Sequence, residues 1–123
     1  MNQGAIFSFP ARDIENVKVF YEKVMGWKFK KKVIMSKMYS GEIYVISIPG
    51  NLKTSFSGFI IKKSLFRQPP IVYYPVKSIY SIIRKIKRYG GEIYYDKEFI
   101  KGIGYVAIIV DPEKNLFGLI EAK

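Results

Sequence analysis

Apolar and polar positions follow the same order in two stretches of the chain. Residues 7–29, FSFPARDIENVKVFYEKVMGWKF, are matched by residues 72–94, VYYPVKSIYSIIRKIKRYGGEIY, at an offset of 65 residues. The same offset pairs Pro10 with Pro75. Each copy predicts a strand, a helix and a second strand, so the chain contains an internal duplication.

Helical periodicity is present in both copies. Apolar residues recur three and four positions apart at Ile14, Val17, Tyr21 and Val24 in the first copy, and at Ile79, Ile82, Ile83, Ile86 and Tyr89 in the second. Asp13 is placed to cap the first helix, and Gly26 and Gly90 are placed to end the two helices. The pattern therefore predicts one helix in each copy.

Short β-rich runs follow each helix. They are GWKFKKKVI, EIYVISIP and SFSGFIIKK in the first half, and GGEIYYD, GYVAIIVD and NLFGLIEA in the second. Pro69 and Pro70 break regular structure between the halves. The chain is predicted to be a single α+β domain over residues 1–123, with a βαβββ module at about 1–63, a connector at about 64–70 and a second module at about 71–123. The modules should pack side by side and carry their helices on the outer face.

Composition favours a packed intracellular protein. Hydrophobic residues make up 49% and aromatic residues 16% of the 123 positions, which is typical of a folded domain. No apolar run approaches the roughly twenty residues that span a bilayer, and the first residues do not resemble a signal peptide. We therefore expect a cytoplasmic protein without a membrane partner. The chain has no Cys and no His, which excludes thiolate nucleophiles and the most common metal ligand and general base.

The formal net charge is +11, and basic residues cluster within 28–32, at Lys62 and Lys63, and within 84–88. Such clusters can bind polyanions. They are more often the solvated faces of ordinary amphipathic elements. Because the clusters lie on separate predicted elements and no nucleic-acid-binding motif accompanies them, we predict no specific nucleic-acid partner.

Two segments carry a family resemblance. FPARDIENVKVFYEKVMGWKF near the start and GIGYVAIIVDPEKNLFGLIE at the end resemble the corresponding segments of the vicinal oxygen chelate superfamily, which contains glyoxalases, bleomycin-resistance proteins and extradiol dioxygenases. The resemblance covers almost the whole chain. It implies paired βαβββ modules whose curved mixed sheet surrounds a central cavity, usually in a homodimer. The apolar connector residues Leu65 and Phe66 also favour dimerisation.

The resemblance also implies four metal-ligand positions, two in each module. Matching the motifs places them at Ile6, Gly58, Ile71 and Gly118. None of these residues has a side-chain donor for a divalent ion. Glu121 falls on the opposite strand face from Gly118 by alternation. We therefore predict no metal and no cofactor, and interpret Gly58 and Gly118 as vacated ligand positions related by the repeat. A strand bulge at each glycine is the alternative.

Alternation along the strands predicts the remaining lining of the cavity. Ser8 shares a strand face with Ile6, Tyr73 shares one with Ile71, and Phe56, Gly58 and Ile60 share another. Tyr44 and Tyr105 are further candidates for hydroxyl groups. The predicted ligand-binding residues are Ser8, Tyr44, Gly58, Tyr73, Tyr105 and Gly118. Such an apolar and aromatic lining suits a small organic molecule.

Three functions remain open at this point. The first is binding of a small organic molecule without metal-dependent chemistry. The second is a metal-independent, glyoxalase-like lyase or isomerase that uses a tyrosine or one of four carboxylates, Glu42, Glu92, Asp96 or Glu98. A polyanion-binding or structural domain is the weakest of the three. Asp111 and Glu113 are better explained as residues of the last turn.

Overall fold

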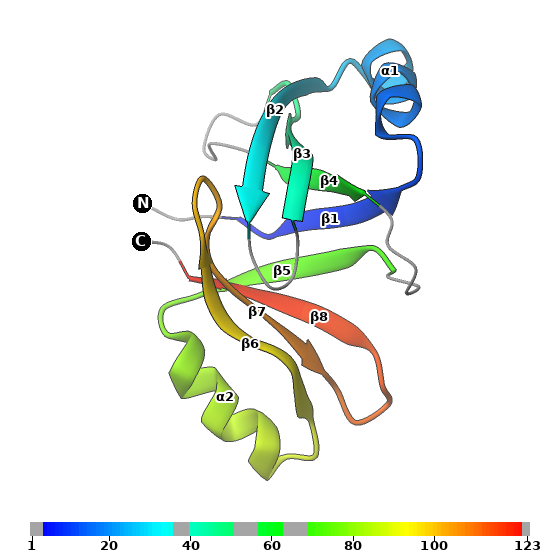
Figure 1. The fold of residues 1–123 in the computed structure, drawn as a ribbon. Helices are drawn as coiled ribbons and strands as arrows, with labels where there is room; N and C mark the ends of the chain where they lie inside the picture. The colour runs from blue at the N-terminus through cyan, green and yellow to red at the C-terminus, as the bar shows by residue number, and fades with distance from the viewer. Residues whose placement is uncertain (1–3, 36–39, 51–56, 63–68, 122–123) are drawn as a thin grey trace.

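The computed structural model describes residues 4–35, 40–50, 57–62 and 69–121 and shows an α+β fold (Figure 1). The elements in chain order are β1 (Ile6–Ala11), α1 (Ile14–Met25), β2 (Lys28–Met35), β3 (Ser40–Ser47), β4 (Gly58–Lys62), β5 (Ile71–Val76), α2 (Ile79–Arg88), β6 (Glu92–Ile100), β7 (Gly104–Val110) and β8 (Leu116–Glu121). The order βαβββ therefore occurs twice, as the sequence predicts. We call β1 to β4 with α1 module 1, and β5 to β8 with α2 module 2.

One mixed sheet joins the two modules. Its eight strands lie in the order β2-β3-β4-β1-β5-β8-β7-β6, and β1 pairs with β5 antiparallel at the centre. In that pairing Phe7 lies opposite Val72, and these two residues are 65 positions apart, as the repeat requires. A pseudo-twofold axis therefore passes between the modules. The predicted fold class is confirmed.

Both helices begin with a side-chain cap. The Asp13 carboxylate accepts a hydrogen bond from the Asn16 N–H at 3.0 Å, and the Ser78 hydroxyl accepts one from the Ser81 N–H at 3.2 Å. α1 ends at Gly26, whose φ of 71° is left-handed. The predicted cap at Asp13 and the predicted end at Gly26 are confirmed. α2 has its C-cap at Tyr89, one residue before the predicted Gly90.

The sheet is curved, with both helices on its outer face (Figure 1). Alternate residues of the strands form a single apolar cluster on the concave face, which includes Ile6, Ile34, Ile43, Phe59, Ile71, Tyr73, Val106, Ile108 and Ile120. The other residues pack against α1 around Ala11, Ile46 and Ile60, and against α2 around Ile79, Ala107, Ile109 and Leu119. The described residues therefore form one core inside the curve and a smaller core under each helix.

The hairpin between β6 and β7 reaches the opposite edge of the curved sheet. Its tip residues Ile100 and Ile103 belong to the same cluster as Ile34 and Ile43 of module 1. A Cβ atom added at Gly102 would lie 3.3 Å from the side chain of Lys32 in β2. The hairpin tip thus covers the concave face at one end, as the approach of this hairpin to β2 in Figure 1 also shows.

Some predictions fall outside the described residues. Phe56 and the connector residues Leu65 and Phe66 are among them. Among the helices of the described ranges, none is long and apolar enough to cross a membrane.

Candidate functional site

Two hydroxyl groups lie at the centre of the concave face. The Ser8 hydroxyl donates a hydrogen bond to the Tyr73 hydroxyl at 3.3 Å, and the two residues are 65 positions apart. Ser8 is 1% exposed and Tyr73 is 0% exposed. The Tyr73 ring also packs against the Phe59 ring, with 5.6 Å between centroids. Alternation along β1 and β5 predicts Ser8 and Tyr73 on this face, and the structure brings their polar atoms into contact.

The ring of Tyr73 explains why residue 118 is a glycine. The two residues pair directly between β5 and β8, and a Cβ atom at Gly118 would lie 2.2 Å from a carbon of that ring. Pairing of β8 with β7 is continuous through Gly118, so the alternative of a bulge is wrong here. The space that a metal ligand would fill is taken by the Tyr73 ring.

Gly58 does not face the concave side, contrary to the sequence-based expectation. It pairs with Phe7 in β1, on the face that α1 covers, and an added Cβ atom would lie 2.3 Å from the Phe7 carbonyl oxygen. The register identifies the true counterpart of Gly118. Because Ser8 pairs with Phe59 as Tyr73 pairs with Gly118, Phe59 is that counterpart. The sequence match was one residue out of register, which reverses the strand face.

Tyr44 and Tyr105 also lie outside the concave face. Tyr44 pairs with Ile60, which packs under α1, and Tyr105 packs against the cluster under α2. The expectation that these two hydroxyl groups line the same cavity as Ser8 and Tyr73 is therefore wrong in its geometry. Strand parity explains the error at Tyr105, because its neighbour Val106 is the residue that faces inward.

Donor atoms for a metal are scarce in the described ranges. No group of three or more carboxylates is placed there to hold an ion. Asp111 instead holds the last turn: its carboxylate accepts hydrogen bonds from the N–H groups of Glu113 at 2.8 Å and Asn115 at 2.9 Å. Its bond to the Asn115 side chain is the main reason that the pKa of Asp111 lies below its ordinary value. The interpretation of Asp111 and Glu113 as turn residues is confirmed.

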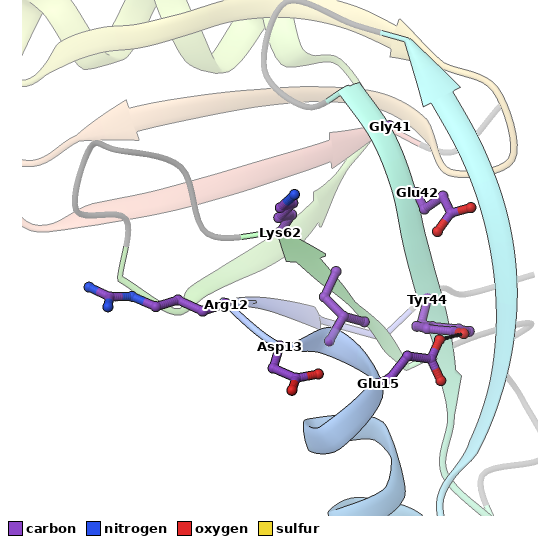
Figure 2. A pocket seen from close by; sticks show the side chains of 8 residues that line it. Arg12, Asp13, Glu15, Gly41, Glu42, Tyr44 and Lys62 are labelled. Atoms are coloured by element: carbon purple, nitrogen blue, oxygen red, sulfur yellow. Dashed lines mark hydrogen bonds between the residues drawn. The ribbon is translucent and has the colours of Figure 1, made fainter.

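A pocket of about 650 Å³ opens on the outer face of module 1, where α1 begins beside β3 and the end of β4. Its lining consists of Arg12, Asp13, Ile14, Glu15, Gly41, Glu42, Tyr44 and Lys62. Figure 2 shows the two basic side chains on one side of the pocket, and Glu15, Glu42 and Tyr44 on the other. Asp13 lies on the side of Arg12, so the pocket presents basic and acidic groups together.

Tyr44 is the most buried of the side chains in this pocket, at 7% exposure. Its hydroxyl donates a short hydrogen bond to the Glu15 carboxylate, which raises the pKa of Tyr44 from 10.0 to about 12. The ammonium groups of Lys18 and Lys31 lie 5.4 Å and 5.8 Å from the centre of its ring. At neutral pH the phenol therefore remains protonated and serves as a hydrogen-bond donor.

The sequence does not predict that Arg12, Glu15 and Lys62 share a site. No motif links them, because they lie at the end of one strand, the start of a helix and the end of another strand. Only the pairing of β1 with β4, which sets Ala11 beside Lys62, places them around one pocket. A correct register of β4 against β1 would have shown that Lys62 lies next to the start of α1.

No protein-family model and no curated protein matches the chain. Solved structures do match it over nearly its whole length. Methylmalonyl-CoA epimerase from Mycobacterium tuberculosis has a TM-score of 0.67 and 12% identity, covering 98% of this chain and 87% of its own. A glyoxalase/bleomycin resistance protein/dioxygenase superfamily member from Vibrio splendidus 12B01 has a TM-score of 0.64 and 14% identity, covering 96% and 97%.

The chain has the glyoxalase/bleomycin resistance/dioxygenase fold. An uncharacterized protein from Methanosarcina mazei is similar as well, with a TM-score of 0.63 and 14% identity over 100% of this chain and 95% of its own. Identities this low establish the shared fold and leave the ligand and the chemistry to be argued from the site.

Proposed function

We propose that the protein binds a small organic molecule on its concave face and performs no metal-dependent chemistry there. The observation that carries this proposal is the set of residues at the four positions from which metal-dependent proteins of this superfamily hold their ion. The family resemblance implies Ile6, Ile71 and Gly118, and the equivalence of the Ser8–Phe59 and Tyr73–Gly118 pairs supports Phe59 as the fourth. None of them offers a nitrogen or oxygen side-chain donor.

The chemistry of the concave face supports an organic ligand. Its walls are isoleucines and the two rings of Phe59 and Tyr73, and the paired hydroxyls of Ser8 and Tyr73 are its central polar atoms. In this structure those side chains pack against one another. A ligand on this face would therefore have to displace some of these side chains.

A thermal-shift screen of small organic molecules, with and without a chelator, tests the proposal. A molecule present at about 100 times its Kd should stabilise the protein by roughly 2.7 kcal/mol. The stabilisation should survive the chelator and weaken in Tyr73→Phe, which removes only a hydroxyl from the concave face. Tyr105→Phe is the matched control, because it removes a hydroxyl from the outer face. A stabilising molecule that needs a divalent ion would contradict the proposal, as would equal effects of the two variants.

One observation favours the second candidate, a metal-independent lyase or isomerase. Of the four carboxylates considered from the sequence, Glu42 shares a pocket with a tyrosine, Tyr44. Glu92 is an exposed partner of Lys114, and Asp96 accepts from the Lys97 N–H. Turnover of keto compounds in the presence of a chelator, lost in both Glu42→Gln and Tyr44→Phe, would support this candidate. Binding without turnover would support the binding protein.

The expected homodimer and the expected lack of a specific nucleic-acid partner stay predictions. The basic residues of β2 and those of α2 lie on different modules, which is why we propose no shared polyanion site.

A further inference from the structure

The pocket of module 1 has a counterpart in module 2. Lys62 pairs with Ala11 at the end of β4, and Glu121 pairs with Val76 at the end of β8. Because Ala11 and Val76 are 65 positions apart, Lys62 and Glu121 are equivalent by the repeat. The two sites therefore have the same place in the fold, beside the start of the helix in each module.

In module 2 this place is filled by the protein's own side chains. The Glu121 carboxylate accepts a hydrogen bond from the Ile79 N–H at 2.8 Å and forms an ion pair with Lys97 at 3.3 Å. The Lys97 ammonium lies 4.4 Å from the centre of the Tyr80 ring and 4.7 Å from that of Tyr105. The side chains of Lys97 and Glu121 are only 16% and 18% exposed. A carboxylate thus occupies the site and is held by a backbone donor and a cation.

In module 1 the corresponding carboxylate is missing. Lys62 replaces Glu121, and Glu15 replaces Tyr80 at the same helix position. Neither Lys62 nor Arg12 is ion-paired with any carboxylate of the described residues. Glu42 is partly neutralised by Lys31 at 3.7 Å, and Glu15 is bonded to Tyr44. Within the described ranges the two cations therefore lack an ion-pair partner, while Asp13 caps α1 by accepting a hydrogen bond from the Asn16 N–H.

We propose that this pocket binds a small organic monocarboxylate, whose carboxylate group takes the place that the Glu121 carboxylate takes in module 2. Arg12 and Lys62 supply the charge that attracts it. Ile14 and the Tyr44 ring form a surface for the organic part. Asp13, Glu15 and Glu42 disfavour a dianion such as phosphate, because additional negative charge would be repelled. The site is separate from the concave face and does not depend on the function proposed for it.

Propionate is a suitable probe because it reproduces the end of a glutamate side chain. Titration of the full chain with sodium propionate, followed by amide NMR, should shift the signals of Ile14 and Glu15 in a saturable manner. Sodium chloride at equal ionic strength should not do so. Lys62→Ala and Arg12→Ala should each weaken propionate binding about tenfold or more, the loss expected for a charge-assisted bond. Lys87→Ala is the matched control, since it removes an exposed lysine from α2.

Lys62→Glu gives an independent test. It rebuilds the arrangement of module 2, so its carboxylate should occupy the site, abolish propionate binding and slow hydrogen exchange at the Ile14 amide. The proposal is overturned if propionate causes no saturable shift, if chloride causes the same shift, or if phosphate binds more tightly than propionate. It is also overturned if Lys87→Ala weakens binding as much as Lys62→Ala.

Discussion

The two modules share one backbone plan and differ at two places on their last strands. Where module 1 has Phe59 on the concave face, module 2 has Gly118 with the Tyr73 ring lying over it. Three residues further on, module 1 has Lys62 beside an open pocket, whereas module 2 has Glu121 in a closed ion pair. The same site of a duplicated fold can thus be filled by side chains in one module and stay open in the other.

Substitutions at Phe59 and at Gly118 should destabilise the protein for opposite reasons, because the first leaves a cavity and the second adds an atom where there is no space. Phe59→Ala removes a fully buried ring and leaves a cavity in module 1, so it should lower the free energy of unfolding by about 4 kcal/mol. Urea denaturation measures this loss. A loss below about 1 kcal/mol would mean that the Phe59 ring is not part of the core between the modules.

At the counterpart position an added methyl group should be destabilising. Gly118→Ala places a Cβ atom against the buried Tyr73 ring, and we expect a loss of about 3 kcal/mol in the same measurement. In a Tyr73→Leu background the ring is gone, so the same substitution should cost less than about 1 kcal/mol. Equal costs in both backgrounds would show that the ring is not the reason for the glycine.

Substitutions beside the starts of α1 and α2 should differ in their effect on stability, because only the site in module 2 is filled by an ion pair. Glu121→Ala leaves Lys97 largely buried without its partner and the Ile79 N–H without its acceptor. We expect a loss of about 2 kcal/mol, below the value for a fully buried pair because both side chains keep some exposure. Lys62→Ala is the matched change in module 1 and should stay within about 0.5 kcal/mol of the parent. Similar losses for the two variants would remove the distinction between a closed and an open site.

The smallest expected difference between the modules concerns the contribution of Tyr44 to stability. It pairs with Ile60 in module 1, where the equivalent pair in module 2 is Ala107 with Leu119. Its pKa is raised to about 12, chiefly by the bond to Glu15. The folded state thus favours the protonated phenol. This contribution to stability is fully present below about pH 10 and is lost as the pH rises through about 12.

Glu15→Gln removes the main cause of that shift. In this variant the pKa of Tyr44 should fall toward 10.0, the ordinary value for the phenol. The phenolate signal that is lost in Tyr44→Phe identifies the group in an absorbance or NMR titration. An unchanged pKa in Glu15→Gln would rule out the carboxylate as the cause.

The fold could be predicted from the sequence because the pattern of each module is local. Helical spacing located α1 and α2, and the offset of 65 between the copies holds in the structure for β1 and β5. The face of β4 could not be predicted in the same way. The loops before β4 and β8 differ in length, and a shift of one residue there exchanged Phe59 for Gly58.

The candidate site was predicted only where it depends on neighbouring residues of one strand. Ser8 and Tyr73 follow from alternation within β1 and β5. The pocket around Lys62 depends on which strands lie side by side and on where each strand ends, and a pattern along a single strand contains neither. For the same reason the equivalence of Lys62 and Glu121 became apparent only from the register.

The central functional claim is that the concave face performs no metal-dependent chemistry, and elemental analysis with calorimetric titration of the unmodified protein tests it most directly. We predict no stoichiometric Zn²⁺, Ni²⁺, Mn²⁺ or Fe²⁺ in the purified protein and no saturable heat on adding them. Ile6→His combined with Ile71→His and Phe59→Glu supplies three donors at the same positions and should create Zn²⁺ or Ni²⁺ affinity. Stoichiometric metal held on the concave face of the unmodified protein would contradict the account, including the assignment of the four positions.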